Sequence, residues 1–514
     1  MFAKLLGVER KMNNLEKLTR EFDTLFGQVY QYNYNLMKKS EKQEMKSQYS
    51  FNAIFDFYIT SNIQSWLKNG FWGYWFSPGM MLNSRCIIEG LALKAMYDSG
   101  DISEEQTELL QKQVFLIEYN CYKRFADISE SFLFPDKLKY DWEQTRSFYF
   151  EKLQDRYSEQ KIKKIIESSN PFLCDDKLNY RKIIGAYLGK EFASWYGLLS
   201  QGSHPSDNTF YQTQDILPLL LGIYDLIKKA YGNLPKTDFT LTSYTAMCMS
   251  PNASRFLDLT KKQCSYLIGV SNVFEEHFGN NYVSNTLQTI CLLLQEMAFD
   301  HLTGLNEQVK SKWKYMLETL ASFHYCYLTQ SFTPQRYELL VQHTNLQFFR
   351  NLDQEYDLSD AYQYYKQIYP NGCDFEIFSK NFKSVAGYTI DENGQSYSLL
   401  EMIRHFISEF ASIPNRDRTM YLDYFESQMI SHANGYMWFA NSGAFMDVTN
   451  IFTATDIGID LLLKKMHTLF KLHEDIDDFR NYKNIVNVLR NTSKKMTPIF
   501  EEKLHLLMLP KIHL

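Results

Sequence analysis

Two long segments of the chain resemble each other. Glu89 and Glu318 occupy matching places in these segments, and so do His204 and His432, each of which follows a tyrosine by eight positions. The two offsets agree, because 318 − 89 = 229 and 432 − 204 = 228. Chance rarely preserves one offset over such a stretch, so we infer a tandem duplication of a unit of roughly 200 to 230 residues.

The length of the chain also points to more than one domain. At 514 residues it exceeds the size at which a single core keeps growing. A hydrophobic content of 45% is ample for packed cores and argues against disorder. We expect an N-terminal helical segment (1–50), a first helical bundle (51–235), a connection (236–280), a second bundle (281–475) and a C-terminal helical tail (476–514).

The periodicity of the apolar residues is helical. With only 12 prolines and 22 glycines, long stretches are unbroken, and apolar residues recur at intervals of three and four. The stretches with this period are 15–26, 83–97, 104–126, 182–201, 214–231, 284–300, 310–329, 334–351, 398–412, 417–440 and 455–472. The predicted fold class is therefore all-α, a tandem duplication of a helical-bundle unit.

Local signals refine these helix boundaries. Ser103 precedes acidic residues as an N-cap would, and Thr333-Pro334 is typical of a helix start at the matching point of the second copy. The segment 237–247 is the best candidate for a strand or an extended linker. An Asp-Glu-Asn-Gly turn signal in 386–398 predicts a protruding loop.

Composition excludes several classes of function. A net charge of −6 gives no overall basic surface for nucleic acid, although a local groove remains open. The eight cysteines are scattered without a CxxC pair, so neither a zinc site nor a disulfide framework is expected. The most apolar run, 216–227, is shorter than the ~20 residues of a membrane helix. We expect a cytoplasmic protein without a membrane segment, a metal or a cofactor.

Polar residues inside apolar helices are the best candidates for a site. In the first copy they are Arg85, Glu89, Tyr196, Ser200, Ser203 and His204. In the second copy they are Lys314, Glu318, Tyr424, Gln428, Ser431 and His432. Arg85 and Glu89 lie one helical turn apart and share a face. Burying such groups is costly unless they satisfy each other, so we expect the two helices to bring them together. The pattern fits a structural network as well as a catalytic one.

The segments RCIIEGLAL and YGLLSQGSH resemble an uncharacterised family of bacterial helical proteins with an Arg-x-x-x-Glu helix and a Tyr-x-x-x-Ser-x-x-x-His element. The likeness covers residues 50–230 well and 280–470 more weakly. The second copy departs from it, since Lys314 replaces the arginine and Gln428 the first serine. This departure implies that the second copy has kept the fold while its site has degenerated.

A more distant likeness is to HEPN ribonucleases, helical bundles of bacterial toxin and antiviral systems that cleave RNA without metal. It implies that His204 acts as the acid and base and Arg85 contacts the phosphate. Glu89, Tyr196, Ser200 and Ser203 would then form the supporting shell. HEPN enzymes carry Arg and His on one helix, four to six residues apart, whereas here the nearest local match is Arg336 to His343.

Two functions from different classes remain open. The first is a stress or antiviral effector with an RNA-directed site in the first copy. The second is a non-catalytic sensor or scaffold that binds a protein or a small ligand at the inter-repeat surface. Either could act with a protein partner or as a homo-oligomer.

Overall fold

The fold is all-α, with two short β-hairpins among the residues that the structure describes. The computed structural model describes residues 17–36, 51–72, 77–126, 136–167, 172–173, 176–177, 179–201, 216–278, 282–325, 333–351, 354–384, 387–409, 448–470 and 484. No helix among these residues is both long enough and apolar enough to cross a bilayer.

A similar order of elements occurs twice among the described residues. The first series is a helix over residues 17–36, α2 (Phe51–Phe71), α3 (Pro78–Asp98), α4 (Glu104–Ala126), α5 (Asp136–Leu153), α6 (Glu159–Ile166), β1 (Phe172–Leu173), β2 (Asp176–Lys177), α7 (Tyr180–Tyr187), α8 (Lys190–Gln201) and α9 (Ile216–Ala230). After α10 (Leu241–Cys248), the second series is α11 (Pro251–Phe278), α12 (Tyr282–Leu302), α13 (Asn306–Phe323), α14 (Pro334–Asn351), α15 (Ser359–Ile368), α16 (Phe375–Phe382), β3 (Gly387–Ile390), β4 (Ser396–Ser398), α17 (Leu399–Ser408) and α20 (Val448–Phe470). The two series differ after their hairpins, since α7, α8 and α9 follow the first hairpin whereas only α17 and α20 are described after the second. This repetition supports a duplication, whose common origin stays a prediction.

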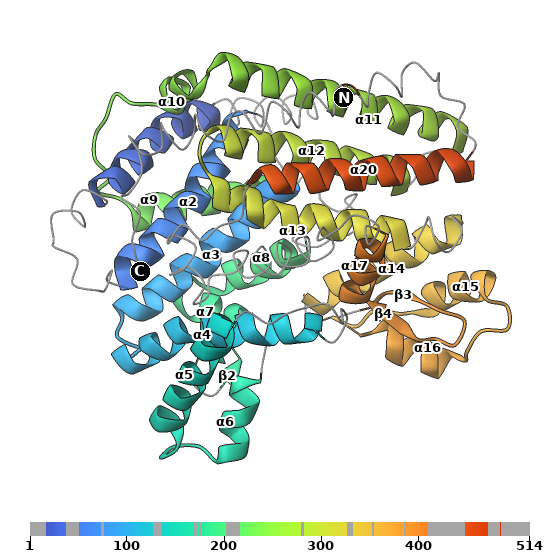
Figure 1. The fold of residues 1–514 in the computed structure, drawn as a ribbon, viewed down its shortest axis with the longest axis horizontal. Coiled ribbons are helices and arrows are strands. Elements are labelled where there is room, and N and C mark those ends of the chain that lie inside the picture. Colours follow the sequence, from blue (N-terminus) through green and yellow to red (C-terminus); the bar gives the residue numbers. More distant parts are fainter. Residues whose placement is uncertain are drawn as a thin grey trace, which may run out of the picture.

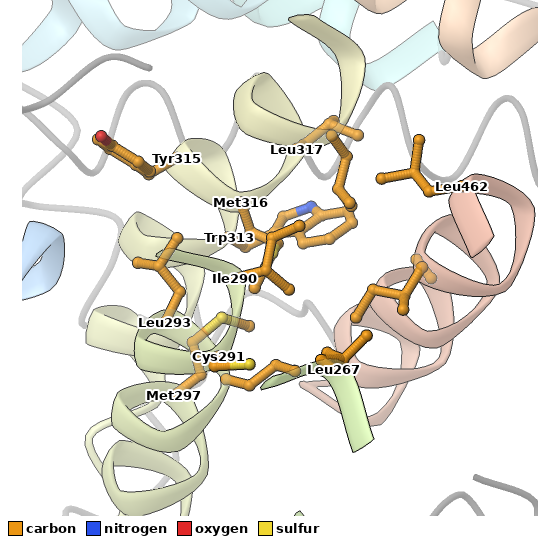
Figure 2. Packing of buried hydrophobic residues seen from close by; sticks show 14 of the residues in the cluster. Leu267, Ile290, Cys291, Leu293, Met297, Trp313, Tyr315, Met316, Leu317 and Leu462 are labelled. Atoms are coloured by element: carbon orange, nitrogen blue, oxygen red, sulfur yellow. The ribbon is translucent and has the colours of Figure 1, made fainter. Parts of the chain in front are cut away.

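Each half contains one large apolar core and one small lobe. The first core joins the helix over 17–36 to α2, α3 and α7 to α10, and the second joins α11, α12, α13, α17 and α20. Figure 2 shows Trp313, Ile290 and Leu462, from α13, α12 and α20, within the second core. The lobes have cores of their own, one between α4, α5 and α6 and the other between α14, α15, α16 and β3. In Figure 1 the two lobes lie below the layers of long helices.

The two halves interlock instead of lying merely side by side. Helices α2 and α3 contact α12 and α13, and α14 of the second half packs on α8 of the first. In return, Phe115 and Ile117 of α4 pack against the second core. Each half is therefore completed by a helix of the other.

Small residues at a spacing of seven bring α11 and α12 close together. The hydroxyl of Ser271 donates to the carbonyl of Ser284 at 3.3 Å, and the hydroxyl of Ser284 donates to the carbonyl of Ser271 at 3.2 Å. One heptad away, Cys264 and Cys291 make the same reciprocal contact. A heptad of small residues at an interface allows two backbones to approach closely. In Figure 1, α11 runs along the top of the view with α12 below it, and α20 packs against α13.

The two predicted helix starts are confirmed. Ser103 Oγ accepts from the backbone N–H of Gln106 at 3.2 Å, and the backbone N–H of Ser103 donates to Gln106 Oε1 at 2.8 Å. Thr333 Oγ1 accepts from the N–H of Arg336 at 3.3 Å. These bonds satisfy N–H groups that have no partner inside the helix.

Two expectations about local structure were wrong. The stretch 237–247 is not a strand, because Thr240 caps α10 by accepting from the N–H of Ser243 at 3.2 Å. The stretch 182–201 is broken between α7 and α8 by Gly189, whose φ of +109° an L side chain rarely adopts. The Asp-Glu-Asn-Gly turn expected in 386–398 is present, and it joins β3 to β4 with Asp391 closing it. The expected connection, 236–280, includes α10 and α11, and its role as a boundary between two bundles stays a prediction.

The close packing of α11 on α12 gives a first prediction. Ser284→Leu should lower the free energy of unfolding by about 1–3 kcal/mol, because Ser284 is 1% exposed and the added carbons must force the helices apart. Ser265→Leu is the matched control, since Ser265 is exposed on the outer face of α11 and its change should stay within about 0.5 kcal/mol. Urea denaturation followed by circular dichroism measures both, and equal effects would contradict the packing.

Candidate functional site

Helices α3 and α13 lie at the centre of the molecule. Every residue from Pro78 to Leu93 on α3 and from Gln308 to Phe323 on α13 is buried. A helix buried on all faces has no solvated side for its polar residues. The charged residues of both helices must therefore find partners inside the protein.

The predicted convergence of Arg85, Glu89 and Tyr196 is present. Arg85 Nε donates to Glu89 Oε1 at 3.0 Å within α3, and the Tyr196 hydroxyl, from α8, donates to the same oxygen at 3.0 Å. The Arg85 guanidinium carbon lies 5.9 Å from the centre of the Tyr196 ring. Arg85 is 2% exposed and Glu89 0%. The group is an internal ion pair and not the wall of an open cleft.

Electrostatics keeps Arg85 charged. Burial alone disfavours the Arg85 cation, but Glu89, Tyr196 and Cys86 together outweigh burial and raise the pKa of Arg85. Burial and the Glu89 carboxylate raise the pKa of Tyr196, which therefore stays a neutral donor.

The matching pair of the second half lies next to the first. Lys314 Nζ is 3.5 Å from Glu318 Oε1 within α13, and both side chains are 1% exposed. Burial lowers the pKa of Lys314, and the positive charge of Arg85 across the α3–α13 contact lowers it further. The structure thus brings the Arg–Glu and Lys–Glu pairs of the two predicted sites into electrostatic contact.

The remaining predicted residues are only partly described. Ser200 lies on α8 and is partly buried. Ser203 and His204 lie outside the described residues, and so do the second-copy residues Tyr424, Gln428, Ser431 and His432. Their roles stay predictions.

The local Arg336–His343 match does not form a site. Arg336 donates to the Tyr369 hydroxyl at 2.7 Å and lies over that ring. His343 is 4% exposed and packs edge-on against Phe382. Burial lowers the pKa of His343 to about 4, so its imidazole is neutral near pH 7. Both residues belong to the packing of the second lobe.

Sequence reasoning missed a second group of buried charges, which we name the charged layer: Lys68, Glu296, Asp300 and Lys312. All four are 0% exposed. Asp300 forms ion pairs with both lysines, and Lys312 Nζ lies 3.8 Å from Glu296 Oε2. Lys68 comes from α2 of the first half, and the others come from α12 and α13 of the second.

Uncharged polar groups join the charged layer to α3. Ser65 Oγ accepts from Lys312 Nζ at 2.8 Å and lies 3.0 Å from Asp300 Oδ1 and 3.1 Å from Asn83 Oδ1. Asn83 Nδ2 donates to Gln308 Oε1 at 2.8 Å. These bonds cross between the halves and satisfy buried groups that would otherwise be costly. Two features of the sequence could have predicted the charged layer. Glu296 and Asp300 lie inside the apolar run of α12. Asn83 and Lys312 are separated by the repeat offset, since 312 − 83 = 229.

Glu296 is pressed against the start of α3. A Cβ atom on Gly79 would lie 1.6 Å from Glu296 Oε2 and 2.4 Å from Lys312 Cε, so any larger residue there would displace these two side chains. Burial raises the pKa of Glu296 to about 7. Burial also lowers the pKa of Lys68 to about 8, despite the attraction of Asp300. The charged layer therefore changes its protonation near neutral pH.

The described residues offer no metal site, since no group of three or more His, Cys, Asp or Glu side chains among them could hold an ion. Comparison of the chain with known protein families, with curated proteins and with solved structures finds no match in any of the three.

The raised pKa of Glu296 gives a second prediction. An unfolded chain ionises Glu296 near 4.5 and the folded chain near 7, so its contribution to stability is full below pH 4.5 and is lost as the pH rises to 7. Between pH 4.5 and pH 7, the free energy of unfolding of the wild type should fall by at most about 3 kcal/mol relative to that of Glu296→Gln. Above pH 7 this difference should not change further.

The check is urea denaturation of both chains between pH 5 and pH 8. Glu276→Gln, an exposed change on α11, is the control and should leave the wild-type pH profile unaltered. A pH profile that is identical in the wild type and Glu296→Gln would contradict the assignment.

Proposed function

We propose that the protein is a non-catalytic helical scaffold whose two lobes present binding surfaces. The observation that carries this proposal is the burial of Arg85, which is 2% exposed and paired with Glu89. A phosphate contact needs a guanidinium that a ligand can reach, and here the charge is already compensated inside the core. The Arg85–Glu89 and Lys314–Glu318 pairs then balance buried charge within α3 and within α13.

The two lobes have different surface chemistry although they occupy matching places in the order of elements. On the first lobe, Arg146 lies over the rings of Trp142 and Phe150 at 5.5 and 5.8 Å, and Lys112 and Lys152 lie over Phe148 at 4.7 and 5.5 Å. On the second lobe, Phe375 and Ile377 at the start of α16 are 43% and 45% exposed.

The second lobe suits a protein partner. Asp374 caps α16, and the acidic Glu376 separates the exposed Phe375 and Ile377 in its first turn. Exposed apolar side chains beside carboxylates are typical of a surface that meets an apolar and basic partner. This difference between the lobes supports a scaffold with two unlike binding surfaces.

Single-stranded RNA is a second candidate ligand, because the first lobe alternates cations with aromatic rings. Tyr140 is 61% exposed on α5, and the Trp142 ring stacks on Tyr119 at 4.5 Å. Aromatic rings and arginine planes are the groups on which bases stack. This surface supports RNA binding without requiring Arg85.

The scaffold proposal predicts that Arg85 contributes to stability and not to RNA cleavage. Arg85→Met should lower the free energy of unfolding by about 3–5 kcal/mol, because it removes the cation that balances the buried Glu89 carboxylate. Arg85→Met/Glu89→Leu should recover part of that loss. Purified wild-type chain should leave single-stranded RNA intact.

His204→Ala separates catalysis from folding when its melting temperature equals that of the wild type. The scaffold proposal would be overturned by one result: the wild type cleaves RNA, and His204→Ala does not cleave it although its melting temperature is unchanged. It would support the effector alternative.

The RNA candidate predicts weaker binding after changes on the first lobe. Arg146→Ala/Lys112→Ala should raise the Kd for a fluorescent single-stranded RNA about tenfold, corresponding to a loss of about 1.4 kcal/mol. Fluorescence anisotropy measures this, and rising salt should weaken wild-type binding. The control is Lys261→Ala/Lys262→Ala, which removes two exposed cations from α11. Equal Kd values for the two double variants would exclude the first lobe as the RNA-binding surface.

A further inference from the structure

Two cysteines face each other across the α11–α12 interface. The thiol of Cys264, on α11, lies 3.5 Å from the carbonyl oxygen of Cys291, and the thiol of Cys291, on α12, lies 3.6 Å from the carbonyl oxygen of Cys264. This reciprocal contact requires the two backbones to run close together. The Ser271–Ser284 contact one heptad away shows the same close approach.

The two thiol groups also affect each other's ionisation. The neighbouring side chain lowers the pKa of Cys264 and raises the pKa of Cys291. The two residues are 3% and 2% exposed. A thiol that ionises more readily beside a second thiol is the arrangement from which a disulfide forms.

We propose that Cys264 and Cys291 form a reversible disulfide that links α11 to α12. With a peroxide as the oxidant, the Cys264 thiolate attacks one oxygen and becomes a sulfenic acid, while the second oxygen leaves as water after taking up a proton. The Cys291 sulfur then attacks the sulfenic sulfur. The S–S bond forms, the S–O bond breaks, and the Cys291 proton leaves with the hydroxide as a second water. The two cysteines are oxidised and the peroxide is reduced.

The position of the bond gives it a structural consequence. Helix α12 carries Glu296 and Asp300 of the charged layer, and α11 covers α12 in the outer layer. A bond between residues 27 apart in sequence restricts the separation of these two helices. Oxidation would thus hold α11 against α12, and a thiol reductant would release it.

The test uses the full chain treated with hydrogen peroxide, denatured in the presence of an alkylating reagent and mapped by mass spectrometry without reduction. The expected result is a cross-linked pair of peptides containing Cys264 and Cys291, with the loss of two alkylated thiols per chain. Dithiothreitol should restore both thiols. The melting temperature of the oxidised chain should exceed that of the reduced chain.

Three variants make the result specific. Cys264→Ser and Cys291→Ser should each abolish the cross-link while leaving the melting temperature of the reduced chain nearly unchanged. Cys86→Ser is the matched control, because Cys86 is also buried and lies on α3, away from this pair, and it should leave the cross-link intact. Either of two results would overturn the proposal. In the first, Cys264 and Cys291 stay fully alkylatable after oxidation; in the second, they link to other cysteines.

Discussion

The charged layer is the interaction on which the arrangement of the two halves depends. Lys68 belongs to the first half, and its partner Asp300 belongs to the second, as do Lys312 and Glu296. Removing four charged groups from water is costly, and the cost is offset only while all of them stay in contact. Separating the halves, or sliding α2 along α12, would leave Lys68 without its carboxylate. The charged layer therefore specifies one register for an interface that apolar packing alone would leave less well defined.

The buried pairs on α3 and α13 also compensate charge inside the protein, along the two central helices. Arg85–Glu89 and Lys314–Glu318 are each satisfied within one helix, so they do not by themselves join the halves. Tyr196 ties the first pair to α8, and α14 of the second half packs on α8. The lobes also differ: the first places cations over aromatic rings, and the second exposes Phe375 and Ile377 beside Glu376. The proposed binding surfaces lie on the lobes for this reason.

Local patterns predicted much of the secondary structure and part of the candidate site. Ser103 and Thr333 begin helices as expected, since capping depends on residues only a few positions apart. The spacing of Arg85 and Glu89 predicted their contact for the same reason. The meeting with Tyr196 followed from the cost of burying polar groups on two helices. Segment 237–247 was misjudged, because the cap that Thr240 supplies outweighs the strand preference of its neighbours.

The sequence by itself determined the all-α class, the main helices and the Arg–Glu and Lys–Glu pairs, because these depend on periodicity and on neighbours one turn apart. The tertiary structure decided that α3 and α13 are buried on every face, that Lys68 meets Asp300, and that Cys264 faces Cys291. These contacts join residues far apart in the chain, and no local pattern encodes which helix faces which. Burial then decides the role of Arg85, since the same side chain could bind a phosphate at the surface but in the core balances Glu89.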